Sequence, residues 1–168
     1  MEEKTVMAFI AGLKEAGINF VSSLTCTGIK SILPHITNDP YFKHVPIANE
    51  GDGISICAGA YLGGKKPAFL AENAGLILGA YQLMNNIHRY GGIPMLLVLD
   101  HRGDFGDIAA EWYFAGGIQV IPLLESHQIP YSIVRNSSEI TNMLVLGQKT
   151  AEAYGKPVAV LLSGEEIW

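Results

Sequence analysis

The sequence contains little cysteine and no long apolar run. Its two cysteines, Cys26 and Cys57, fit neither a disulfide framework nor the spacing of a zinc site. No basic segment followed by an apolar one opens the chain, and no apolar run reaches the ~18 residues that a membrane span requires. These absences predict a cytoplasmic protein with no membrane segment, no structural disulfide and no metal ligands of its own.

Charged residues are scarce as well. They make up only 16% of the chain, the net charge is −5 and no run of Lys and Arg occurs. This argues against nucleic acid or an anionic membrane as the main partner. Hydrophobic residues make up 49%, more than a solitary soluble domain needs. We therefore expect a sheet that is covered on both faces and, in addition, a subunit interface.

Helical and strand patterns alternate along the whole chain. Short strands are expected at 20–24, 44–48, 67–71, 93–99, 130–134 and 157–162. Helices are expected at 29–36, 51–62, 76–89, 118–126 and 137–154, after a first one at 5–16, with a polar and aromatic loop at 101–117. The alternation predicts an α/β fold, a three-layer α/β/α sandwich with a six-stranded parallel sheet, in one domain spanning residues 1–168.

A carboxylate marks the junction between the second strand and the helix after it. The β-branched residues Val45 and Ile47 lead to Asn49 and Glu50, and glycines and small apolar residues of helical length follow. Ligands of open α/β sheets bind at the carboxyl ends of the strands, so Glu50 is a candidate acid or base. The alternative is that Glu50 only stabilises the positive end of the helix, by roughly a few tenths of a kcal/mol.

Two helical segments, 54–62 and 76–86, carry small and apolar residues on nearly every side. A helix without a polar face is normally buried, and a domain of this size cannot bury an outer helix with its own sheet alone. We expect one or both segments to pack against another subunit. A tightly packed monomer is the alternative.

Five segments together resemble the pyrimidine-binding domain of thiamine-diphosphate-dependent decarboxylases. They are Asn49-Glu50, the stretch from Ala58 to Pro67, Asn73-Ala74-Gly75, the apolar strand 93–98 and His101-Arg102-Gly103. The resemblance covers nearly the whole chain in order, and the block from Glu50 to Pro67 is its most specific part. Within the family it is strongest to the alpha subunits of sulfopyruvate decarboxylase and to phosphonopyruvate decarboxylase.

The resemblance implies that Glu50 hydrogen-bonds the aminopyrimidine ring of thiamine diphosphate. A carboxylate there favours the imino form of the ring, which activates the cofactor to attack a 2-oxo acid and to accept electrons as CO2 leaves. The implied function is the alpha subunit of a decarboxylase, a carboxy-lyase acting on a small 2-oxo acid with an anionic second group. A carboligase subunit with the same cofactor and a non-catalytic binding or regulatory subunit are the alternatives.

Asn73-Ala74-Gly75 matches a family turn whose backbone lies near the cofactor and the substrate. Gly75 would let the chain approach closely and begin the next helix. Two residues depart from the family pattern, because Ile77 replaces a glycine and Glu72 stands where relatives tend to have an uncharged amide. For Asn73 the alternative is a plain helix N-cap.

His101 and Arg102 follow the strongest strand pattern, which places them at the same sheet edge and makes them candidate substrate-binding residues. Arg102 could bind a carboxylate, sulfonate or phosphonate with its fork of donors, and His101 could donate to it or carry a proton. Alternatively, Arg102 pairs locally with Asp104 or Asp107.

Thr25 and Thr27 flank Cys26 after the first strand and before an expected helix N-terminus, which is a typical anion site. They are therefore further candidates for substrate binding. Helix capping by Thr27 explains them equally well. The segment 111–114, with its three aromatic residues, is expected either to close over the substrate or to form an interface.

Gly51-Asp52-Gly53 does not complete the Mg2+ motif of this enzyme family, because no Asn follows at the required distance. The resemblance therefore implies that the thiamine diphosphate is shared with a separate beta subunit, which binds the diphosphate and holds the Mg2+. The beta subunit or a second copy of this chain is expected to dock on 54–62 and 76–86. The implied assembly is an α2β2 heterotetramer or a multiple of it.

Overall fold

The computed structural model describes residues 1–88, 92–107, 109–164 and 167. Its strands are β1 (Phe20–Ser23), β2 (Lys43–Pro46), β3 (Pro67–Glu72), β4 (Leu96–Asp100), β5 (Tyr131–Val134) and β6 (Val158–Leu162). Its helices are α1 (Glu3–Glu15), α2 (Leu33–Asn38), α3 (Glu50–Leu62), α4 (Asn73–Leu78), α5 (Ala80–His88), α6 (Ala110–Ser126) and α7 (Ile140–Tyr154), with a short 3-10 helix, η1 (Ser137–Glu139), before α7.

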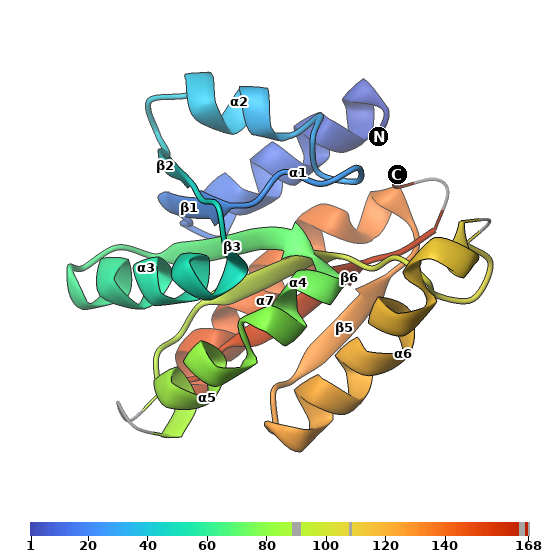
Figure 1. Ribbon diagram of the computed structural model, residues 1–168. Coiled ribbons are helices and arrows are strands. Elements are labelled where there is room, and N and C mark those ends of the chain that lie inside the picture. Colours follow the sequence, from blue (N-terminus) through green and yellow to red (C-terminus); the bar gives the residue numbers. More distant parts are fainter. Residues whose placement is uncertain (89–91, 108, 165–166, 168) are drawn as a thin grey trace.

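These strands form one six-stranded sheet, all parallel, in the order β2-β1-β3-β4-β6-β5. Helices α1, α2 and α7 cover one face of the sheet, and helices α3 to α6 cover the other (Figure 1). The predicted α/β/α sandwich with a six-stranded parallel sheet is therefore confirmed. Because all strands run the same way, their carboxyl ends share one edge, which is where such sheets bind ligands.

The central strand β4 shows how the sequence specifies two cores. Leu96 and Val98 belong to the core beneath α1, α2 and α7, whereas Leu97 and Leu99 belong to the core beneath α3 to α6. Successive side chains of a strand point to opposite faces, so a strand buried on both faces must be apolar throughout. Each fully buried side chain of this kind contributes roughly 1.5–3 kcal/mol.

The helix α6 is longer than the sequence pattern predicts. It begins at Ala110, so segment 111–114 is helical and the expected loop at 101–117 is shorter. Glycine at position 117 is required for packing, because a Cβ there would overlap the backbone of Gly103. Close approach of two backbones has overridden the low helix propensity of glycine.

Two other helices also differ from expectation. The single helix expected at 76–89 is instead the pair α4 and α5, which meet at Gly79; position 89 lies outside the described residues. A Cβ on Gly79 would overlap Ile54, so glycine at this position allows α3 to pack closely. Turns occupy 27–32 and α2 begins only at Leu33, so Thr27 does not precede a helix N-terminus directly.

Several large apolar side chains of the helix layer α3 to α6 are exposed to solvent. Leu78 is 67% exposed on α4, Tyr81 62% on α5 and Trp112 81% on α6. Apolar patches of this kind usually mark an interaction surface. No described helix is long and apolar enough to cross a membrane.

Candidate functional site

A cavity of about 230 Å3 opens at the carboxyl edge of the sheet. It is bounded by the segment after β1, the start of α3, the end of β3 and the helix α4. Its wall consists of Leu24, Thr25, Cys26, Glu50, Glu72, Ala74, Gly75 and Leu78. Four of the residues predicted from sequence to bind cofactor or substrate therefore meet here, namely Thr25, Glu50, Ala74 and Gly75.

Glu50 is the first residue of α3 and lies against Gly75. Asn49 caps the helix by accepting a hydrogen bond from the Gly51 backbone N–H at 2.9 Å, which leaves the Glu50 carboxylate free of the capping task. A Cβ added to Gly75 would overlap that carboxylate. Glycine at position 75 is therefore required for Glu50 to occupy the cavity wall.

Glu72 is a second carboxylate of the cavity that sequence reasoning did not identify as functional. It ends β3 and pairs in register with Asp100 at the end of β4. Burial raises the pKa of Glu72, and the negative charges of Asp100 and Glu50 raise it further, whereas Arg102 opposes the shift. Its position as the last strand residue before Asn73 is the sequence signal that would have identified it.

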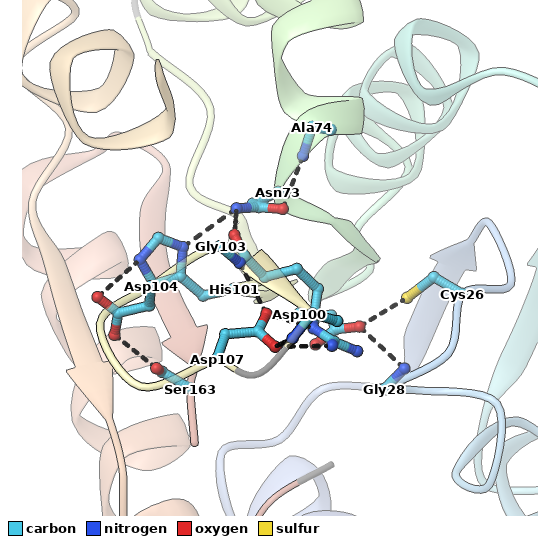
Figure 2. A network of polar contacts seen from close by, with 12 residues as sticks. Cys26, Gly28, Asn73, Ala74, Asp100, His101, Gly103, Asp104, Asp107 and Ser163 are labelled. Atoms are coloured by element: carbon cyan, nitrogen blue, oxygen red, sulfur yellow. Dashed lines mark hydrogen bonds and ion pairs between the residues drawn. The ribbon is translucent and has the colours of Figure 1, made fainter. Parts of the chain in front are cut away.

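Asp100 is fully buried and joins the end of β4 to the segment after β1. Its Oδ2 accepts hydrogen bonds from the Gly28 backbone N–H at 2.9 Å and from the Cys26 thiol at 3.5 Å (Figure 2). Burial, followed by the charge of Asp100, raises the pKa of Cys26 to about 12. The thiol is therefore protonated at neutral pH and is a poor nucleophile.

Asn73 connects the ends of β3 and β4. Its side chain is fully buried, with Nδ2 donating to the Arg102 carbonyl at 2.7 Å and lying 3.2 Å from His101 Nδ1. The Ala74 N–H donates to its Oδ1 at 3.0 Å (Figure 2). Asn73 does not line the cavity, and its contacts instead position Ala74 and Gly75, which do.

Arg102 forms the local pair that the sequence left open as an alternative. Its Nε and Nη2 donate to the two carboxylate oxygens of Asp107 at 2.9 and 3.0 Å, and its Cζ lies 4.5 Å from the centre of the Tyr113 ring. Hydrogen bonding from Arg102 lowers the pKa of Asp107 to about 2. Arg102 is only 8% exposed, so this pair is largely shielded from solvent.

His101 is also directed into the protein. The side chain is 2% exposed, and Nε2 lies 3.9 Å from Oδ1 of Asp104, whose other oxygen accepts a hydrogen bond from Ser163 at 2.6 Å (Figure 2). Burial lowers the pKa of His101 more than Asp104 raises it, which favours the neutral ring near pH 7.

The remaining candidates divide between the cavity and the surface. Thr25 is exposed at the cavity wall, while Thr27 is exposed and is not among the residues that line it. Asp52 is exposed on the first turn of α3. Among the residues that the structure describes, no group of three or more His, Cys, Asp or Glu side chains could hold a metal ion.

The fold and the cavity define the class of protein. This is an α/β domain with a cavity at the carboxyl edge of a parallel sheet, and a carboxylate on the cavity wall lies against a glycine. A 2-oxoglutarate:ferredoxin oxidoreductase from Magnetococcus marinus, solved with 2-oxoglutarate, coenzyme A and succinyl-CoA bound, shares the fold with a TM-score of 0.68. The match has 21% sequence identity and covers 99% of this chain and 29% of the oxidoreductase chain.

Sequence relatives identify the family. The chain is 31% identical to the sulfopyruvate decarboxylase subunit alpha of Methanococcus maripaludis over 92% of both chains. It is also 31% identical to that of Methanocaldococcus jannaschii, over 92% of this chain and 90% of the relative. Phosphonopyruvate decarboxylase of Streptomyces viridochromogenes is 23% identical over 77% of this chain and 32% of the relative. The chain belongs to the sulfopyruvate decarboxylase alpha-subunit family, as its motifs predict, although no model of a protein family matches it.

Proposed function

We propose that this chain is the alpha subunit of a thiamine-diphosphate-dependent decarboxylase of a small, sulfopyruvate- or phosphonopyruvate-like 2-oxo acid. Residues 1–168 would form its pyrimidine-binding domain. The observation that carries the proposal is the Glu50 carboxylate, which lines the cavity at the carboxyl edge and lies against Gly75. Membership of the alpha-subunit family supports the reaction class.

The cavity has the features that an aminopyrimidine ring requires. Leu24 and Leu78 provide apolar walls, Gly75 provides space, and Glu50 provides a carboxylate for a ring nitrogen. When bound, thiamine diphosphate supplies the electron sink for loss of CO2. Glu50 would hold a proton at the ring nitrogen, because its place at the start of α3 fixes the carboxylate at the cavity wall.

Other residues of the chain would orient these groups. Asn73 ties the start of α4 to the Arg102 backbone, so it would keep Ala74 and Gly75 in place beside the cofactor. Thr25 has an exposed hydroxyl at the cavity wall, where it would meet the substrate. Substrate binding by Thr27, His101 and Arg102 stays a prediction, and in this structure Arg102 is bonded to Asp107.

A separate beta subunit would bind the diphosphate and the Mg2+, and a second copy of this chain would complete the assembly. The relatives are named as alpha subunits, which supports a partner. The exposed apolar side chains of α4, α5 and α6 support docking on this face, including the 76–86 segment. Tyr81→Asp should weaken assembly roughly tenfold or more. Tyr154→Asp, at a similarly exposed tyrosine on α7, is the matched control.

The experiment for this proposal is a decarboxylation assay of the complex assembled with the beta subunit. Pyruvate, sulfopyruvate and phosphonopyruvate are the substrates, and CO2 release is measured with and without thiamine diphosphate. We expect the complex to release CO2 in a cofactor-dependent way from sulfopyruvate, phosphonopyruvate or both, which carry a second anionic group. The alpha chain alone should release none. Release without thiamine diphosphate would contradict the proposed cofactor dependence. Micromolar, Mg2+-dependent cofactor binding by the alpha chain alone, measured by calorimetry, would contradict the shared site.

A further inference from the structure

The second carboxylate of the cavity, Glu72, has no task in the function proposed above. It is half-buried at the end of β3, lies beside Asp100 on β4, and makes no capping hydrogen bond to α4. Glu72 and Glu50 both line the cavity. None of the described residues that line this cavity is Lys, Arg or His.

The groups that face Glu72 are mostly negative or neutral. Asp100 on β4 and Glu50 on α3 both raise its pKa, after burial itself, and the neighbouring Cys26 after β1 is a protonated thiol. The opposing positive charge comes from Arg102, whose guanidinium is already bound by Asp107. The surroundings of Glu72 therefore favour its uncharged form.

The proposed reaction requires an anion to enter this cavity, because every 2-oxo acid carries a carboxylate. Two ionised carboxylates on a partly desolvated wall would repel that substrate. Glu50 is the first residue of the 13-residue helix α3, whereas Glu72 ends a strand directly beside the buried carboxylate of Asp100. Glu72 is accordingly the member of the pair that is suited to be neutral.

We propose that Glu72 acts as a neutral carboxylic acid and donates a hydrogen bond from its O–H group to the carboxylate of the 2-oxo acid substrate. A protonated carboxyl has one donor, whereas an ionised one has only acceptors and would leave the substrate oxygen unpaired. The inference rests on the proposed function, since an uncharged ligand would not need a neutral donor. It assigns substrate binding to a residue that departs from the amide expected at this position.

The test compares pH profiles of KM in the assembled, cofactor-loaded complex. For the wild type, KM for the 2-oxo acid should rise as the pH passes above the pKa of Glu72, because the donor is lost and a repelling charge appears. Glu72→Gln keeps a donor without a charge, so its KM should be independent of pH in that range. Glu72→Ala should raise KM roughly ten- to hundredfold at low pH, as expected for a lost hydrogen bond to a charged group.

Glu15→Gln is the control variant, because Glu15 is exposed at the end of α1, away from the cavity. Its KM profile should follow that of the wild type. The same profile for wild type and Glu72→Gln would overturn the inference.

Infrared difference spectra of wild type minus Glu72→Gln report the protonation state without turnover. At the pH of lowest KM, the wild type should show a carboxylic-acid C=O band that the variant lacks, and only carboxylate bands would overturn the inference. If the band is present but the complex decarboxylates no 2-oxo acid, the proposed function fails and the substrate role of Glu72 fails with it. If the complex is active without the band, only the role of Glu72 fails.

Discussion

Two polar clusters lie at the same edge of the sheet. The charged groups of one bind each other in the interior, whereas those of the other line a cavity. In the first, Arg102 and Asp107 bind each other through two hydrogen bonds, and both are buried. In the second, Glu50 and Glu72 face a cavity. Removing one partner of a buried ion pair leaves the other charge uncompensated in the protein interior, whereas carboxylates that line a cavity are available to a ligand.

The largest expected effect comes from breaking the first cluster. Arg102→Ala leaves the Asp107 carboxylate buried without its bidentate partner, which should lower the free energy of unfolding by about 3–5 kcal/mol. Urea unfolding followed by circular dichroism measures it. Arg135→Ala removes the more exposed partner of Asp104, and should cost only about 0–1 kcal/mol. Equal effects of the two variants would remove the distinction between a buried and an exposed pair.

A smaller effect is expected from adding a methyl group beside Glu50 in the second cluster. Gly75→Ala places a methyl group where the Glu50 carboxylate lies, so kcat/KM of the assembled complex should fall about 100-fold. The alpha chain should remain folded, because the displaced side chain lines an open cavity. At Gly63, where a Cβ would make ordinary contacts, the change to Ala should leave activity near that of the wild type. An unaffected Gly75→Ala complex would show that the position of Glu50 is not critical.

The smallest effect is the acid sensitivity of the first cluster. The pKa of Asp107 is lowered from 3.8 to about 2 in the folded chain, so its stabilisation is complete above pH 3.8 and is lost as pH falls through about 2. This contribution amounts to about 2 kcal/mol. The wild type should therefore lose more stability across that window than Asp107→Asn in urea unfolding. Parallel pH dependences would mean that Asp107 is not held by Arg102 in solution.

Much of the fold follows from the sequence, because strand and helical patterns alternate along it, and the four inner strands β1, β3, β4 and β6 are buried as their apolar patterns require. The start of α6 could not be predicted in this way. Gly116 and Gly117 suggest a loop, but they lie where the helix closely approaches Ala74 and the Gly103 backbone. Only the tertiary structure shows these close approaches, which override local propensity.

For the site, the sequence places Glu50 correctly at a strand-to-helix junction of the carboxyl edge. It could not choose a partner for Arg102, since spacing alone offers both Asp104 and Asp107. The loop decides this, because the Gly103 and Ala109 backbone N–H groups also donate to Asp107 and hold its carboxylate toward Arg102. Such choices depend on loop conformation, which periodicity does not encode.

The central claim is that Glu50 acts on the cofactor, and proton exchange at the reactive carbon of thiamine diphosphate tests it most directly. Exchange is followed by NMR in the assembled complex for the wild type, Glu50→Gln and Asp52→Asn, the last altering an exposed carboxylate on the same turn of α3. We predict that exchange falls to the rate of the free cofactor in Glu50→Gln alone. Exchange at the wild-type rate in Glu50→Gln, with cofactor bound, would contradict the assignment.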